Sequence, residues 1–200
     1  MTTLAGGVYT GAGGGSQAAA VVGGQENQWG VMPQMRSKAD ILRLLDDPDA
    51  LAGTGWPAVR GLRSLLCSAD AGVRAKAAHA LGRLAELEAA RDPEKVRDLL
   101  RRLFWSLNDE SGNSGLGVPE AIAEVIALRP DLWAGYVGPL LGRLDEPGLR
   151  DGLMAAVDRL AASPALVRAA APALVHLTAG PDPETATAAR EAAKRMGVEI

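Results

Sequence analysis

The sequence contains few of the residues on which reactive or disulfide-stabilised sites depend. Its 200 residues include one cysteine, Cys67, and two histidines, His79 and His176. A single cysteine excludes an intramolecular disulfide and a zinc site made of several cysteines. The two histidines are far apart and match no metal-ligand spacing, so we expect a structural or surface role for each. Because Cys67 follows an apolar helical stretch, we expect a buried thiol there.

Aromatic residues and long apolar runs are also scarce. Aromatics make up 4% of the chain, and its apolar content comes mainly from alanine and leucine, which favour helices and their close approach. No long stretch alternates with period two, which argues against a large sheet. No run approaches the roughly 18 apolar residues that a transmembrane helix needs, so we expect no membrane span. The N-terminus lacks the features of a secretory signal, and the expected location is cytoplasmic.

The chain has no excess of positive charge. Lysine and arginine number 21 against 24 aspartates and glutamates, a formal net charge of −3. Proteins that bind nucleic acids usually carry a basic balance or a basic stripe, so we expect no nucleic-acid partner. Seventeen of the basic residues are arginine, however, and arginine suits local anion-binding patches.

Residues 1–35 differ in composition from the rest of the chain. Nine of the first 30 residues are glycine, and Glu26 is the only charged residue before Arg36. This composition is typical of a flexible, low-complexity leader that cannot bury enough apolar surface to order itself. We therefore expect the folded domain to span residues 36–200.

From Ser37 onward the sequence reads as a series of amphipathic helices. The clearest stripe recurs every three or four residues and comprises Val96, Leu99, Leu100, Leu103, Phe104 and Leu107. Asp92-Pro93, Ser163-Pro164 and Asp182-Pro183 each place a capping residue before a proline suited to a first helical turn. Helical pairs recur at spacings of roughly 33–38 residues, which indicates stacked hairpins. The predicted fold is all-α, a right-handed α-α superhelix of about four helical hairpins.

One segment resembles a known repeat family. Residues 70–85 contain the pattern D-x-x-V-R-x-x-A-A-x-A-L-G-x-L, and they resemble a HEAT repeat of the phycobilisome-lyase type. In such repeats the arginine, here Arg74, often pairs with the loop aspartate. The resemblance also implies a helix kink like the one we expect at Pro139, which removes a hydrogen bond to the Gly135 carbonyl. Nothing in the sequence identifies a bilin pocket.

Residues 107–120, LNDESGNSGLGVPE, interrupt the helical pattern with a polar, glycine-rich loop. Together with Ala121 they resemble a motif, L-N-D-E-S-G-x-x-G-x-G-x-P-E-A, of small bacterial HEAT-like proteins. On the preceding helix Trp105 lies off the apolar stripe, beside two arginines. Tryptophan and arginine are enriched among the residues that dominate binding energy. The candidate binding residues are Arg101, Arg102, Trp105, Asn108, Asp109, Glu110, Ser111, Gly112, Gly115, Gly117, Glu120 and Glu124.

Several structural interpretations of this region stay open at the level of sequence. The loop residues can simply cap two helices, with Glu120 at the positive end of the second one. They can bind a polar ligand or a basic partner segment. Asp109, Ser111, Asn113 and Glu120 also fall at positions 1, 3, 5 and 12 of a calcium-loop template, although its position 6 needs glycine and is Ser114. Trp105 can equally belong to the core between repeats.

The sequence contains no catalytic constellation, so we expect neither catalytic residues, nor a metal site, nor a cofactor. Glu120 and Glu124 have the spacing of paired carboxylates on one helix face, which is more typical of a solvated face than of acid–base chemistry. The leading hypothesis is a non-enzymatic interaction module whose partner is another protein. One alternative is an enzyme that resembles the HEAT-like glycosylases of DNA alkylation repair. The other is a regulator that binds a small ligand or a cation.

Overall fold

The regular structure is helical throughout residues 38–47, 53–108 and 115–200, which are the residues that the computed structural model describes. No β-strand occurs in these ranges. The predicted leader, residues 1–35, lies outside them, so the domain boundary at residue 36 stays a prediction.

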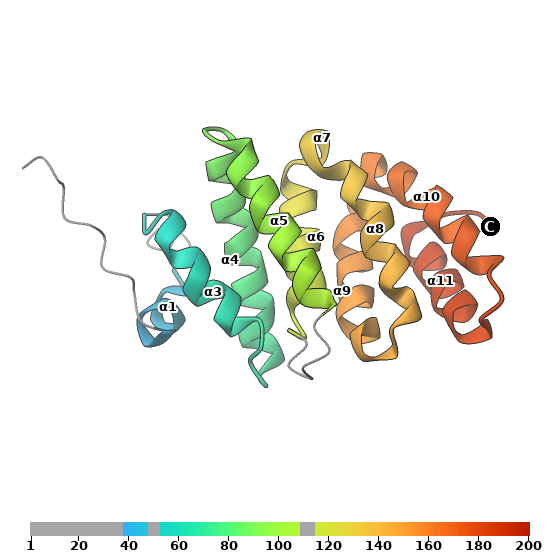
Figure 1. The fold of residues 1–200 in the computed structure, drawn as a ribbon, viewed down its shortest axis with the longest axis horizontal. Helices are drawn as coiled ribbons and strands as arrows, with labels where there is room; N and C mark the ends of the chain where they lie inside the picture. The colour runs from blue at the N-terminus through green and yellow to red at the C-terminus, as the bar shows by residue number, and fades with distance from the viewer. Residues whose placement is uncertain (1–37, 48–52, 109–114) are drawn as a thin grey trace, which may run out of the picture. The chain divides into compact units, whose positions relative to one another are not determined.

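The described residues form helical hairpins joined by short turns (Figure 1). The principal helices are α1 (Lys38–Leu44), α3 (Val59–Leu65), α4 (Ala71–Ala89), α5 (Pro93–Leu107), α6 (Val118–Leu128), α7 (Pro130–Trp133), α8 (Val137–Leu141), α9 (Arg150–Ala161), α10 (Pro164–Thr178) and α11 (Pro183–Met196). Four 3-10 helices complete the set: η1 (Trp56–Ala58), η2 (Ala134–Tyr136), η3 (Gly142–Asp145) and η4 (Pro147–Leu149).

The hairpins stack so that equivalent helices become neighbours. In one layer α4 packs against α6, α6 against α9, and α9 against α11. The first helices of the hairpins cover this layer: α3 packs on α4, α5 on α6, and α10 on α11. The third hairpin pairs the segment from α7 to η3 with α9 (Figure 1). This stacking confirms the predicted all-α superhelix of helical hairpins.

Helix α6 has neighbours on several sides. It contacts α4, α5, α7, α8 and α9, and most of its residues are buried. Gly82 permits the close approach of α4, because a Cβ at this position would lie 2.8 Å from Cβ of Glu124 on α6. The absence of a side chain at Gly82 thus lets α4 and α6 of successive hairpins approach closely.

Predicted helix ends are largely confirmed. Asp70 caps α4 by accepting hydrogen bonds from Gly72 N at 2.7 Å and Val73 N at 3.2 Å. Asp92 and Asp182 cap α5 and α11 in the same way, each before a proline. Ser163 stands at the start of α10, but its side chain makes no capping hydrogen bond. Each aspartate satisfies backbone N–H groups that have no partner within the helix.

The helix break expected near Pro139 is present. The segment from Pro130 to Asp145 is divided into α7, η2, α8 and η3, and η2 includes Gly135. The proline cannot donate a backbone hydrogen bond, so a continuous α-helix is disfavoured here.

The prediction of a buried Cys67 is wrong. Helix α3 ends at Leu65, and Cys67 lies in the turn that follows, where it is exposed. The apolar stripe on which the prediction was based stops at Leu66, which is fully buried.

Candidate functional site

Trp105 lies near the end of α5 on the solvent side of the helix. Its side chain is 78% exposed, whereas the adjacent Phe104 is partly buried and stacks on Tyr136 with ring centroids 5.7 Å apart. The alternative in which Trp105 belongs to the core between repeats is therefore wrong. An exposed indole on an ordered helix offers a large, rigid apolar surface for contact.

Arg101 and Arg102 accompany Trp105 on α5, and both are exposed. Nη1 of Arg101 lies 2.7 Å from the Asp98 carboxylate. Arg102 makes no ion pair with any of the described residues. Asp98 thus pairs with the arginine three residues after it and not with Arg102, which is four residues after it.

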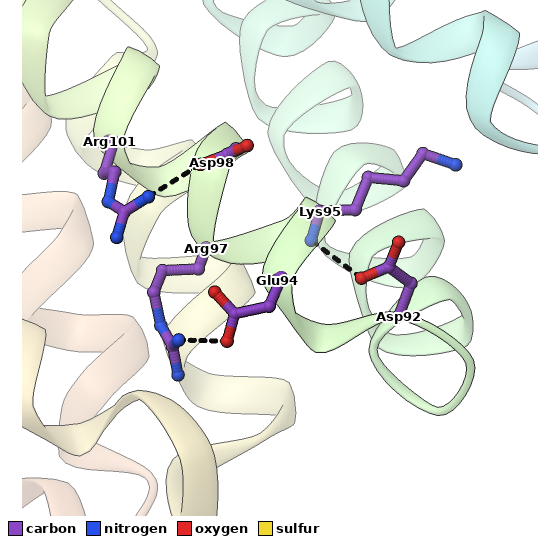
Figure 2. A network of polar contacts seen from close by, with 6 residues as sticks. All are labelled: Asp92, Glu94, Lys95, Arg97, Asp98 and Arg101. Carbon is purple, nitrogen blue, oxygen red and sulfur yellow. Dashed lines mark hydrogen bonds and ion pairs between the residues drawn. The ribbon is translucent and has the colours of Figure 1, made fainter.

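Charged residues in the first turns of α5 make contacts within the helix and with neighbouring elements. Figure 2 shows Asp92 accepting the backbone N–H of Lys95, and Arg97 and Arg101 reaching Glu94 and Asp98 along the helix. Two of the cations also contact neighbouring elements. Nζ of Lys95 lies 4.9 Å from the Trp56 ring centroid, and the Arg97 guanidinium lies 5.8 Å from that of Trp133.

Asn108 ends α5 and takes part in a contact between hairpins. Its side-chain amide donates to the Phe104 carbonyl at 3.3 Å. Nη2 of Arg143, which belongs to η3, donates to Oδ1 of Asn108 at 2.6 Å and to the Leu107 carbonyl at 3.4 Å. Arg143 thus caps a helix of the preceding hairpin, and a cation is favourable at that negative helix end. No local sequence signal could have identified this partner, which is 35 residues away.

The acidic half of the loop lies outside the described residues. This half includes Asp109, Glu110, Ser111 and Gly112 of the predicted site, as well as Asn113 of the calcium template. The metal interpretation of the loop therefore stays a prediction. Among the described residues, no three His, Cys, Asp or Glu side chains form a group that could hold a metal ion.

The second half of the loop docks on the preceding hairpin. Gly115 and Gly117 are buried, and Gly117 N donates to the Leu66 carbonyl at 3.0 Å. A Cβ on Gly117 would lie 3.2 Å from this carbonyl oxygen and from Cβ of Arg74. Gly117 also occupies the N-cap position of α6, without a side-chain capping hydrogen bond. These contacts give this part of the loop a packing role.

Glu120 lies in the first turn of α6 and is partly buried. Burial raises the pKa of its carboxyl above the ordinary value, and the positive charge of Arg74 opposes the shift. Arg74 itself donates hydrogen bonds to the carbonyls of Ser68 at 2.8 Å and Ala69 at 3.1 Å. The expected pairing of Arg74 with the loop aspartate is thus replaced by a contact with the backbone of the same turn.

Glu124 joins three successive helices of one layer. Its side chain is 14% exposed, and its Oε2 lies 3.0 Å from Nε of Arg159 on α9 and 3.5 Å from Nδ1 of His79 on α4. Among the described residues, neither Glu120 nor Glu124 forms an ion pair or hydrogen bond with Arg101, Arg102 or Trp105. The predicted site therefore separates into an exposed group on α5 and a packed group on α6.

A groove that the sequence did not reveal runs between α9 and α11. Its volume is about 840 Å³, and Met154 contributes to its apolar lining. Its two arginines are already paired, because Arg150 lies 3.3 Å from Glu184 and Arg195 lies 3.0 Å from Asp158. The groove therefore has few unsatisfied charges with which to select a ligand.

Comparison with known proteins identifies a relative that is itself uncharacterized. No known protein family matches the sequence. An uncharacterized protein from Archaeoglobus fulgidus is 36% identical over 85 residues, which are 42% of this chain and 43% of that protein. This chain thus matches less than half the length of that relative. Among solved structures, the designed armadillo repeat protein YIII(Dq)4CqI aligns with a TM-score of 0.44 and 25% identity, over 80% of this chain and 74% of that one.

None of the described helices is both long and apolar enough to cross a membrane. The packing of its own helices identifies the chain as an all-α helical-repeat protein.

Proposed function

We propose that this protein is a non-enzymatic interaction module that binds another protein through the exposed face of α5. The single observation that carries the proposal is Trp105, whose large apolar side chain is 78% exposed on a well-anchored helix. Exposing an indole is unfavourable in water, so a partner that covers it gains apolar burial. Arg101 and Arg102 beside it supply polar contacts at the rim of such a surface.

The repeat architecture supports this proposal. Each hairpin contacts mainly its neighbours, so the stack leaves helix faces open along its length, and repeat proteins use such faces for binding. The packed group of the predicted site serves the scaffold, because Gly117, Glu120 and Glu124 connect neighbouring hairpins. The acidic segment that follows Asn108 adjoins α5 in sequence, and we include Asp109 and Glu110 in the proposed surface.

The HEAT-like assignment and the cytoplasmic location belong to the same proposal. Residues 70–85 form the cap and most of α4, whose Ala77, Ala78 and Leu81 are fully buried. This burial supports the resemblance, because these are the core positions of the repeat pattern.

The test compares the partners of four purified proteins: the wild type, Trp105→Ala, Trp105→Phe and the control Val175→Ala. Val175 is another exposed apolar residue, on α10, at 51% exposure. Binding partners are first identified by crosslinking, and their affinities are then measured by calorimetry. We expect Trp105→Ala to weaken binding about 30-fold, because residues that dominate an interface cost about 2 kcal/mol or more when truncated. Val175→Ala should bind normally, and Trp105→Phe should lose less than Trp105→Ala.

Equal affinities of all four proteins for every partner would refute the role of Trp105. A measurement with duplex DNA at low salt distinguishes the glycosylase alternative, since that enzyme would bind DNA with a strong salt dependence.

A further inference from the structure

The groove between α9 and α11 combines apolar and acidic side chains along its length. Its apolar part is formed by Met154 and Ala155 of α9 and by Ala188 of α11. Met154 is partly buried and packs against the core, so its position is set by the packing of the helices. The volume of about 840 Å³ lies within the range of pockets that hold a ligand.

Ion pairs join the two helices at both ends of this groove. Arg150 lies 3.3 Å from Glu184 in the first turns of the helices. Arg195 lies 3.0 Å from Asp158 toward their C-terminal ends. Arg150 and Asp158 are eight positions apart on α9, which corresponds to about 12 Å of helix. An extended chain covers this length with about four residues, so the groove suits a short segment of a partner.

The few charges that remain unsatisfied in the groove are negative. Four carboxylates line it against two guanidinium groups, so negative charges exceed positive ones by two within the lining. Asp151 is exposed and forms no ion pair or hydrogen bond within the described part of the chain. Glu191 and Asp158 share Arg195, at 2.6 Å and 3.0 Å. A cation that enters the groove therefore meets one free carboxylate and two that share a single guanidinium.

Three further cations lie on these helices without lining the groove. Nε of Arg159 lies 3.0 Å from Glu124 on α6. Arg190 and Lys194 are exposed on α11 and are not part of the lining. They weaken the negative potential of the groove through solvent, where salt screens them, and none of the three pairs with Asp151.

Lysine and arginine side chains match both properties of the groove. Each has an aliphatic stem that gains from contact with apolar surface and a charged head that pairs with a carboxylate. Met154 and Ala155 follow Asp151 by three and four positions, so they lie on the same side of α9. A basic side chain can thus rest its stem on Met154 while its head reaches Asp151.

We propose that the α9–α11 groove binds a short basic segment of a partner protein, whose lysine or arginine side chains lie along Met154 and pair with Asp151 and Glu191. The groove belongs to the layer formed by α4, α6, α9 and α11, whereas Trp105 lies on α5 in the covering layer. This proposal therefore does not depend on Trp105, and each surface can be tested without the other.

The test measures binding of a capped nine-residue peptide of alternating arginine and alanine by calorimetry at physiological ionic strength. The comparison peptide carries citrulline in place of arginine, because citrulline keeps the shape of the side chain without its charge. The wild type should bind the citrulline peptide about tenfold more weakly than the arginine peptide, or not at all.

Two charge reversals locate the site on the protein. Asp151→Lys should weaken binding of the arginine peptide about tenfold or more, because it replaces the free carboxylate with a cation. Asp145→Lys is the matched control, since Asp145 is exposed on η3, does not line the groove and undergoes the same change of charge. This control should change the affinity less than about twofold. Trp105→Ala should bind the peptide as the wild type does.

Circular dichroism verifies that each variant is folded. Should Asp151→Lys misfold, Glu191→Gln provides the substitute, because Glu191 is exposed and its removal leaves Arg195 paired with Asp158. We expect Glu191→Gln to weaken binding about threefold, compared with no change in Asp145→Asn.

The proposal is overturned if the wild type does not bind the arginine peptide with a Kd of about 1 mM or tighter. It is also overturned if the citrulline peptide binds equally well, or if the variants of Asp145 weaken binding as much as those of the groove. Spermine tests a free polyamine as the ligand. Weaker binding of spermine than of the peptide supports a partner segment, whereas tighter binding that depends on Asp151 would assign the groove to a small cation and overturn the proposal.

Discussion

Helices α5 and α6 are consecutive members of one hairpin, yet they differ in how much of their surface is exposed to solvent. Helix α6 buries most of its residues, and only its partly buried glutamates and last few residues reach the surface. Helix α5 buries one stripe and exposes Arg101, Arg102 and Trp105 on the opposite side. The comparison separates residues that hold the hairpins together from residues that remain available to a partner.

The difference follows from position in the stack. Helix α6 lies between α4 and α9 and is also covered by α5, so most directions around it are occupied. Helix α5 lies in the covering layer, where an amphipathic pattern suffices. Substitutions in α6 should therefore change stability, while those on the open face of α5 should change binding. The predictions below test this division.

The largest effect is expected at Ile122, which is fully buried in the middle of α6. Truncation to alanine removes three carbons and leaves a cavity among several helices. We expect Ile122→Ala to lower the free energy of unfolding by about 2–5 kcal/mol, measured by urea denaturation. A loss below 1 kcal/mol would contradict the central role that we assign to α6.

A smaller loss is expected where α9 meets the start of α6. A Cβ on Gly152 would lie 2.8 Å from the Leu116 carbonyl oxygen, so the two backbones must separate. We expect Gly152→Ala to cost about 1–3 kcal/mol in unfolding free energy, because overpacking outweighs the better helix propensity of alanine.

Gly142→Ala is the matched control for this substitution. A Cβ there meets nothing within 4 Å, and the backbone has ordinary helical angles. This control should be neutral or slightly stabilising. Equal losses in both variants would show that close packing at Gly152 is not the cause.

The third prediction concerns the pH dependence of Glu120, whose pKa is raised by burial. When folding raises the pKa of a carboxyl, the group stabilises the folded state at pH values below its unfolded pKa, near 4.5. This stabilisation is lost as the pH rises through the pKa of the folded state. Glutamine does not ionise and avoids this loss. Glu120→Gln should therefore gain stability over the wild type as the pH rises from about 4 to 7, measured by urea denaturation at each pH.

Glu94→Gln offers the comparison in α5. Glu94 is an exposed carboxylate in the first turn, where a negative charge is favourable. This variant should show no gain at neutral pH. If both glutamine variants lose stability equally, burial is not what distinguishes Glu120.

The smallest effect on stability is expected at Trp105. Because its side chain is mostly exposed, Trp105→Ala should change the free energy of unfolding by no more than about 0.5 kcal/mol. The same denaturation experiment measures it. A loss comparable to that of Ile122→Ala would mean that Trp105 supports the fold, and the division between the two helices would fail.

Much of the fold could be predicted because its determinants are local. The apolar stripe of α5 and the aspartate–proline starts of α5 and α11 depend on residues a few positions apart. Cys67 shows the limit of the same reasoning: the stripe indicates which face is buried but not the residue at which the helix ends.

The candidate site was predicted only in part because its contacts are made between hairpins. The off-stripe position of Trp105 follows from helical periodicity, and its exposure agrees. Arg143 donates a hydrogen bond to Asn108, and Arg159 forms an ion pair with Glu124. Both contacts depend on how the hairpins stack. Similarly, a small pocket between α3 and α5 combines residues from these two helices and from α6 that no linear motif connects.

The hydrogen bond from Gly117 N to the Leu66 carbonyl has a consequence for dynamics. It joins the turn of one hairpin to the turn of the preceding one, 51 positions earlier in the chain. The amide hydrogen of Gly117 can exchange with solvent deuterium only when these two units part. Its exchange rate therefore reports how often neighbouring repeats separate, and so whether this stack opens hairpin by hairpin or as one cooperative unit.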